Sequence, residues 1–160
     1  MKKLFLGCGW LLAVVLSAGI LESQEITVQT GSGKHVLGRA DIEALPHMKV
    51  TASEHSSPVL FEGVALKSVL EKAGVSFGES LKGKRLAACL VVEAADEYRV
   101  VIALPELDPA FTDKQTLLVF LRDGKPLGEK EGPYRIVIPD EKRMARWVRQ
   151  VTALKIVEVP

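Results

Sequence analysis

Short apolar stretches separated by turn residues are the feature that most constrains the fold of this chain. Residues 25–30 alternate polar and apolar side chains, as a half-buried strand does. Further strands are expected at 35–37, 48–52, 85–94, 98–103, 116–122, 134–139 and 151–159. Short helices are expected at 39–45 and 66–73, and a short helical turn is expected at 142–149. Many short strands with few short helices predict a mainly β domain of the α+β class.

The first residues have the composition of an export signal. Lys2 and Lys3 precede residues 4–21, which contain no charged side chain, and small residues follow. We therefore interpret residues 1–23 as a Sec-type signal peptide and residues 24–160 as one domain. Cleavage after Ser23 is favoured over cleavage after Gly19, and a retained membrane anchor is the alternative. The predicted location is the periplasm, without membrane insertion after cleavage.

The charge of the mature chain argues against two classes of partner. The full sequence has 21 basic and 20 acidic residues, and removal of Lys2, Lys3 and Glu22 leaves 19 of each. A formally neutral domain has no overall field that would attract nucleic acid or anionic lipid, so neither is expected as a partner.

Cysteine and histidine give little indication of a metal site. Cys89 would be the only cysteine left after cleavage, so no disulfide can form within the chain. It lies in an apolar stretch, where a small buried hydrophobe is favoured over a reactive thiol or a metal ligand. His35, His47 and His55 are in separate segments without metal-ligand spacing. His55 alone is a candidate ligand contact, because it lies in the predicted polar loop 53–58.

The last third of the chain combines an aromatic residue with basic residues. In a helix over 142–149, Arg143 and Trp147 would share one face, while Lys142, Arg146 and Arg149 would share another. A planar heterocycle needs an aromatic or guanidinium plane for stacking and polar partners at its edge. Carboxylates that could supply such partners are Glu131, Asp140 and Glu141. The alternative is that Trp147 anchors the core beneath a solvated basic face.

Several segments together resemble the molybdopterin-binding domain of the sulfite-oxidase family. The specific matches are Gly-Pro-Tyr-Arg-Ile-Val-Ile-Pro at 132–139, Ala-Arg-Trp-Val at 145–148, the segment 61–66 and the turn 94–98. The resemblance implies a mainly β fold with a mixed or barrel-like sheet. It also implies that the segments at 132–135 and 146–147 line a pterin pocket. The predicted site contains Trp147, Arg135, Arg146, Arg143, Glu131, Gly132, Tyr134, Asp140 and His55.

One residue expected from this resemblance is missing. Enzymes of the family hold molybdenum through a cysteine thiolate, whereas the corresponding stretch 49–57 contains no sulfur. A soft metal centre of that type needs a deprotonated soft ligand. The leader also lacks an arginine pair, which indicates export of an unfolded chain that must find its ligand outside the cytoplasm. A bound pterin without molybdenum is therefore expected, and no catalytic residue is assigned.

The chain is similar to periplasmic pterin-binding regulators that share this architecture. The resemblance implies a non-catalytic pterin sensor that reports its ligand state to the periplasmic domain of a membrane protein making or degrading cyclic di-GMP. The first alternative is a degenerate molybdopterin oxidoreductase, or an accessory subunit of one. The second alternative is a plain interaction module with an empty pocket.

Overall fold

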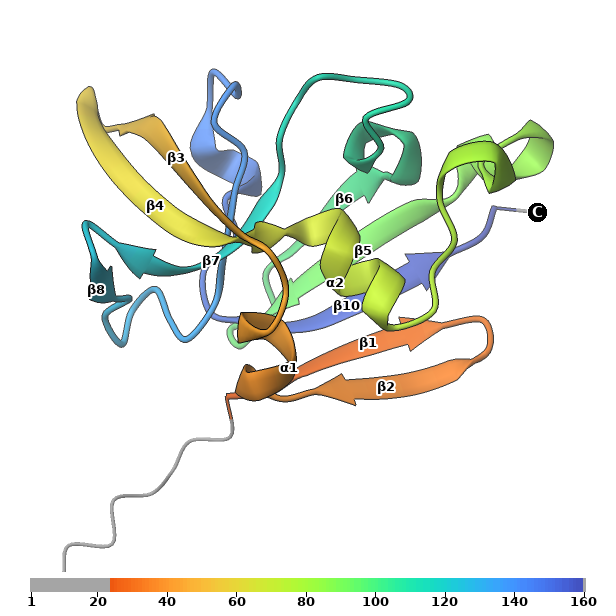
Figure 1. Ribbon diagram of the computed structural model, residues 1–160, viewed down its shortest axis with the longest axis horizontal. Coiled ribbons are helices and arrows are strands. Elements are labelled where there is room, and N and C mark those ends of the chain that lie inside the picture. Colours follow the sequence, from red (N-terminus) through yellow and green to blue (C-terminus); the bar gives the residue numbers. More distant parts are fainter. Residues whose placement is uncertain (1–23, 160) are drawn as a thin grey trace, which may run out of the picture.

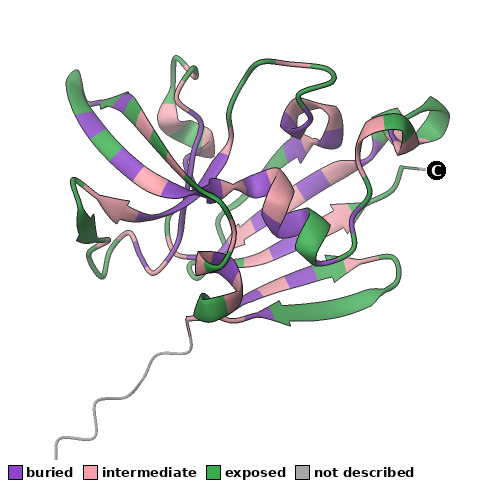
Figure 2. Cartoon of the chain, in the orientation of Figure 1, coloured by how far each residue is buried: buried purple, intermediate pink, exposed green. Residues whose placement is uncertain are grey.

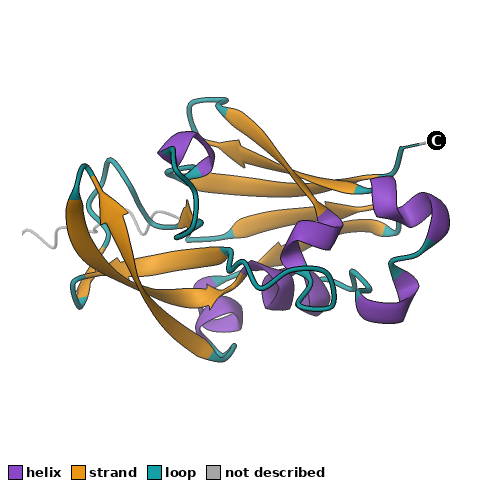
Figure 3. Cartoon of the chain, turned by 90° about the horizontal axis from the view of Figure 1, so that it is seen from above, coloured by secondary structure: helices purple, strands orange, loops and turns teal. Residues whose placement is uncertain are grey.

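Two sheets pack together in the computed structural model, which describes residues 24–159 (Figure 1). The predicted leader, residues 1–23, lies outside the described residues. Strands predominate and the helices are short, so the expected α+β class is confirmed (Figure 3). Within the described part of the chain the sheets stay open, and the barrel-like alternative is not formed.

The first sheet joins the beginning and the end of the domain. Its strand order is β2-β1-β10-β5-β6, in which β1 and β10 are parallel and the other pairs antiparallel. The strands in that order are Gly33–Leu37, Ile26–Thr30, Val151–Val157, Cys89–Ala94 and Arg99–Ala103. Val28, Val92 and Leu154 are fully buried, because alternate positions of a strand face the same side of the sheet.

The second sheet has the order β3-β4-β7-β8, and β9 also pairs with β7. These strands are His47–Glu54, Ser57–Ala65, Leu117–Arg122, Lys125–Pro126 and Arg135–Val137. The pairing of β4 with β7 shifts between Glu62 and Gly63. At that shift the two backbones approach so closely that a Cβ atom on Gly63 would overlap backbone atoms of Leu118 and Val119. A glycine is therefore required at this crossing.

Within residues 24–159, two α-helices and four 3₁₀-helices connect the strands. The α-helices are α1 at Arg39–Glu43 and α2 at Leu66–Lys72. The 3₁₀-helices are η1 at Gly78–Ser80, η2 at Gly83–Ala87, η3 at Leu104–Leu107 and η4 at Met144–Arg146. The apolar face predicted for α2 is buried against the sheets, and Gly74 follows the helix with a φ of 87°. Among residues 24–159, no helix has the length and apolar character that a membrane span requires.

A single hydrophobic core lies between the layers. Buried side chains from both sheets and from α2 form one cluster, visible as the buried positions in Figure 2. Phe61 of β4 and Trp147, which follows η4, meet edge to face in this core, with ring centroids 5.9 Å apart. The segment after β9 is thereby fixed to the second sheet.

The predicted polar loop 53–58 is wrong, because the chain reverses there within two residues. β3 and β4 stay paired to the end, with Glu54 opposite Ser57. Between them His55 and Ser56 have φ values of 49° and 69°. Positive φ at both central residues is typical of the tight hairpin turn whose twist suits antiparallel strands. Glu54 therefore belongs to a regular strand rather than to a loop.

Of the helical turn expected over 142–149, only η4 forms. Tertiary hydrogen bonds hold this segment extended beside β9. The Ile136 amide donates to the Val148 carbonyl at 2.8 Å, and the indole Nε1 of Trp147 donates to the Ile138 carbonyl at 3.0 Å. The shared helical faces expected for the basic residues therefore do not exist.

The expected strand over 85–94 is shorter than predicted, because η2 occupies its first residues. Cys89 begins β5 and is half-buried, so the expectation of a fully buried cysteine is wrong. Leu90 and Val92 face the core with no exposed surface, which places Cys89 on the opposite face of the sheet.

Candidate functional site

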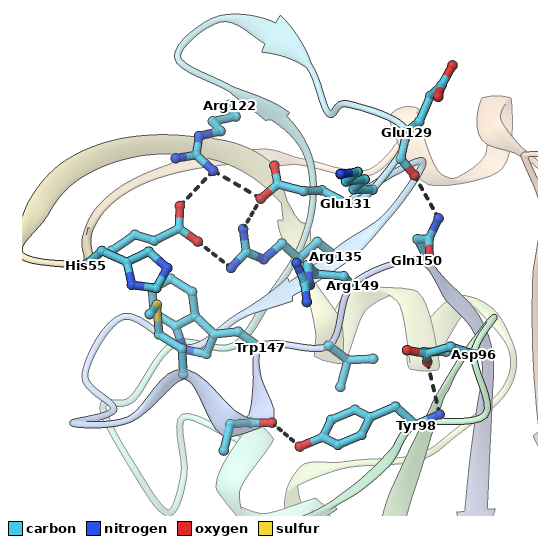
Figure 4. Close-up of a pocket in the computed structure, with 16 residues that line it drawn as sticks. His55, Asp96, Tyr98, Arg122, Glu129, Glu131, Arg135, Trp147, Arg149 and Gln150 are labelled. Atoms are coloured by element: carbon cyan, nitrogen blue, oxygen red, sulfur yellow. Dashed lines mark hydrogen bonds and ion pairs between the residues drawn. The ribbon is translucent and has the colours of Figure 1, made fainter.

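A cavity of about 940 Å³ opens where the ends of both sheets meet the C-terminal segment (Figure 4). The turn between β3 and β4, the turn between β5 and β6, the end of β7 and the residues around β9 and η4 form its wall. The lining residues are Glu54, His55, Ala94, Asp96, Tyr98, Arg122, Glu129, Lys130, Glu131, Arg135, Met144, Ala145, Trp147, Val148, Arg149 and Gln150.

Trp147 and Arg135 form the aromatic part of the wall. The guanidinium carbon of Arg135 lies 5.5 Å from the Trp147 ring centroid and 5.6 Å from that of Phe61. Trp147 is 4% exposed. The structure thus gives Trp147 the core position foreseen as the alternative and also a place in the cavity wall. Whether its ring stacks on a ligand stays a prediction.

Two carboxylates and two guanidinium groups form a closed ring of ion pairs in the cavity wall, visible in Figure 4. We call Glu54, Arg122, Glu131 and Arg135 the ion-pair ring. Arg135 donates from Nη2 to Oε1 of Glu54 at 2.6 Å and from Nη1 to Oε1 of Glu131 at 2.7 Å. Arg122 Nη1 closes the ring, 3.0 Å from Glu131 Oε1 and 2.7 Å from Glu54 Oε2.

The ring holds Glu54 ionised although its side chain is buried. Burial alone would raise the pKa of Glu54. The hydrogen bond from Arg135 and the positive charges of Arg135 and Arg122 outweigh burial, and they hold the pKa of Glu54 below its ordinary value of 4.5. A buried ion pair of this kind needs both partners, since removal of one leaves an uncompensated charge.

Several polar atoms of the ring make no hydrogen bond to protein in the described part of the chain. Nε of Arg135 and Oε2 of Glu54 are buried and make none, although Oε2 of Glu54 lies 2.7 Å from Nη1 of Arg122. Oε1 of Glu131 accepts both guanidinium hydrogen bonds, which leaves Oε2 free. Nε of Arg135 has almost no accessible surface, so Oε2 of Glu131 is the polar atom that the ring offers to a ligand.

The turn between β5 and β6 forms the opposite side of the cavity. Tyr98 is half-exposed there, and its hydroxyl donates to the Ala145 carbonyl at 2.7 Å. Its amide donates to Oδ1 of Asp96 at 3.1 Å. Tyr98 therefore ties the first sheet to the segment that carries Trp147.

Four of the nine residues predicted for the site line the cavity, namely Trp147, Arg135, Glu131 and His55. The other five lie elsewhere: Arg143, Arg146, Gly132, Tyr134 and Asp140.

Arg146 is engaged by carboxylates outside the cavity. It pairs with Glu141 and with Glu106, whose Oε2 lies 3.2 Å from Nη2 of Arg146. Arg143 and Asp140 are exposed at the surface. The guanidinium group of Arg146 thus braces η4 against η3.

Tyr134 and Gly132 lie behind the cavity wall. The Tyr134 hydroxyl donates to the Gln24 carbonyl at 3.2 Å, and burial raises its pKa to about 12. Gly132 is buried against Leu127. These residues position β9, and within this stretch Arg135 lines the cavity.

Glu54 and Arg122 belong to the site but were not predicted from the sequence. One signal for Glu54 was available. Met48, Val50, Ala52 and Glu54 occupy alternate positions of β3, and their lower exposure marks the inward face. No local pattern identifies Arg122, because its partners are distant in the sequence.

The fold belongs to the sulfite-oxidase-like molybdopterin-binding class. One similar solved structure is the crystal structure of the sulfane dehydrogenase SoxCD from Paracoccus pantotrophus, with a TM-score of 0.65 and 20% sequence identity. The match covers 84% of this chain and 38% of that chain, and at this identity it shows the fold alone. No curated protein sequence matches the chain.

The family follows from a separate comparison. Residues 20–160 match the family described as the oxidoreductase molybdopterin binding domain. The chain therefore belongs to that family.

The molybdenum of this family does not fit the donors present in the cavity. Among the described residues no cysteine lines the cavity, and the half-buried Cys89 is in β5. Residues 24–159 contain no cluster of three or more histidine, cysteine or acidic side chains able to hold a metal. The organic pterin fits better, because the wall offers an aromatic ring, guanidinium groups and a carboxylate oxygen.

Proposed function

We propose that this domain binds a pterin in the cavity beside Trp147 and that the bound pterin carries no molybdenum. One observation carries the proposal: the cavity of a molybdopterin-family fold is lined by aromatic, guanidinium and carboxylate groups without a thiolate. Trp147 and the Arg135 plane offer a surface against which a flat heterocycle can lie. Oε2 of Glu131 accepts N–H groups from the pterin edge.

A sensor role in the periplasm is the second part of the proposal. It is supported by the leader-like residues 1–23 and by the resemblance to pterin-binding regulators. In this role the pterin-bound domain contacts the periplasmic part of a membrane protein that makes or degrades cyclic di-GMP. A shift in that contact would require the partner to bind the pterin-loaded and the empty domain with different affinities.

The second candidate function is a molybdopterin-dependent oxidoreductase or an accessory subunit of one. Membership of the oxidoreductase molybdopterin-binding family supports this function more directly than the sensor role. The chain spans 38% of the SoxCD chain that it matches, so the activity of that larger protein is not transferred here.

Titration of the purified protein with neopterin tests the proposal. We expect saturable binding, followed by the fluorescence of the pterin. Trp147→Phe and Glu131→Gln should each weaken the affinity by about tenfold, since each removes a contact at the ligand. Lys155→Ala is the control, because Lys155 pairs with Glu93 in the first sheet and does not line the cavity.

Two outcomes would contradict the proposed site. The first is an absence of neopterin binding by folded wild-type protein. The second is binding that is unchanged in folded Trp147→Phe and Glu131→Gln variants, because it would place the ligand elsewhere on the molecule.

A further inference from the structure

The ion-pair ring determines which charge a ligand of the cavity can carry. Both terminal nitrogens of Arg135 are hydrogen-bonded to carboxylates, and Nη1 of Arg122 contacts the same two carboxylates. The Arg135 side chain is 4% exposed, whereas that of Arg122 is 35% exposed. The guanidinium groups that could bind a phosphate are therefore already neutralised within the protein.

A phosphate group that contacts these arginines would come close to the carboxylates of Glu54 and Glu131, because both carboxylates bind the same guanidinium groups. It would therefore lie beside two like charges in a partly desolvated site. Like charges brought together in such a site disfavour binding strongly.

The remaining charged groups of the cavity do not supply a net positive field. Lys130 and Arg149 carry positive charge, Asp96 and Glu129 carry negative charge, and all four are exposed. Together with the ion-pair ring, the cavity wall has four cations and four anions. A phosphoryl group carries a charge of about −1.5 to −2 at pH 7 and finds no excess of cations here.

The wall meets the needs of an uncharged ring without bringing like charges together. Oε2 of Glu131 accepts no hydrogen bond within the described residues. A pterin ring has N–H groups at its edge that can donate to this oxygen. Binding of the pterin therefore leaves every ion pair of the ion-pair ring intact.

We infer that the cavity selects an unphosphorylated, uncharged pterin over a phosphorylated one, and that Glu54 and Glu131 determine this selectivity by balancing the positive charges of Arg122 and Arg135. The inference rests on the proposed pterin function and adds the chemical class of the ligand. It separates this chain from proteins that hold the phosphorylated pterin of a molybdenum cofactor, because the two arginines here bring no unbalanced positive charge to its phosphate.

The test compares neopterin with neopterin monophosphate, which share the ring and differ in the phosphate. Dissociation constants of both are measured with the purified wild-type protein. We expect the monophosphate to bind at least about tenfold more weakly. In Glu131→Gln, Arg122 loses one of its two carboxylate partners. The dissociation constant of the monophosphate divided by that of neopterin should therefore fall towards one.

Glu129→Gln is the matched control for charge. Glu129 also lines the cavity and its removal changes the net charge equally, but its carboxylate holds no guanidinium group in the described structure. In Glu129→Gln the ratio of the two dissociation constants should remain close to that of the wild type. Thermal melting of each variant establishes that it is folded.

The outcomes distinguish this inference from the proposed function. Failure of both compounds to bind overturns the proposed function. Binding of the monophosphate as tightly as neopterin, or more tightly, overturns the selectivity inference and leaves the pterin function in place. A wild-type preference that folded Glu131→Gln retains in full overturns the assignment of selectivity to the ion-pair ring.

Discussion

The guanidinium group of Arg135 lies over the ring of Trp147 at 5.5 Å while two carboxylates bind its terminal nitrogens. Arg135 thus links the aromatic core to the polar wall of the cavity, and its side chain is almost fully buried. A residue in this position serves both the stability of the domain and the chemistry of its cavity.

Arg135→Met should lower the free energy of unfolding by about 3–5 kcal/mol, because Glu54 would keep a buried charge with one partner fewer. Urea denaturation measures this change. The control is Arg99→Ala, which removes an exposed ion pair with Glu93 and should cost less than about 1 kcal/mol. Equal losses in both variants would show that burial of the ion-pair ring contributes little.

Gly63→Ala should destabilise the domain by about 3 kcal/mol or more, since its Cβ atom would overlap the backbone of β7. Backbone atoms cannot rotate away as a flexible side chain can. Gly31→Ala is the matched control, because a Cβ atom there meets no atom within 4 Å. Melting temperatures of the two variants check this prediction, and a Gly63→Ala protein as stable as the wild type would contradict the close approach.

Glu54 should make stability depend on pH in the acid range. Its pKa is depressed in the folded state, so its contribution is complete above the unfolded pKa near 4.5. That contribution is lost as the pH falls through the lower folded value. Urea midpoints at several pH values between 7 and 3 should therefore fall more steeply for wild type than for Glu54→Gln. Parallel curves would contradict the assignment.

Trp147→Phe should reduce the free energy of unfolding by about 1–2 kcal/mol, because the Ile138 carbonyl loses its indole donor. The same variant should bind neopterin about tenfold more weakly if the indole contacts the ligand. Calorimetric titration and urea denaturation of one preparation separate the two effects. A folded variant with unchanged affinity would assign Trp147 to the core alone.

The pattern of short strands predicted most of the fold, because alternation of buried and exposed positions is local. The helical turn expected over 142–149 is limited to η4 for the opposite reason. Its basic residues have helical spacing, but hydrogen bonds from Ile136 and to Ile138 fix the segment beside β9. These contacts depend on tertiary structure and leave no local signal.

The site was predictable only in part. Arg135 and Trp147 lie in the two sequence motifs of the last third of the chain, 132–139 and 145–148. The ion-pair ring, in contrast, joins Glu54 to Arg135 across 81 residues. Such a pairing cannot be recognised from spacing. The alternation along β3 nevertheless points Glu54 inward, and an inward carboxylate at a strand end indicates a charged partner.

Metal and pterin content of the protein purified from its native source tests the central claim most directly. The account predicts near-ultraviolet absorption and blue fluorescence of a bound pterin together with molybdenum far below stoichiometric amounts, since no thiolate lines the cavity. A preparation that contains stoichiometric molybdenum would contradict the account and support the oxidoreductase function.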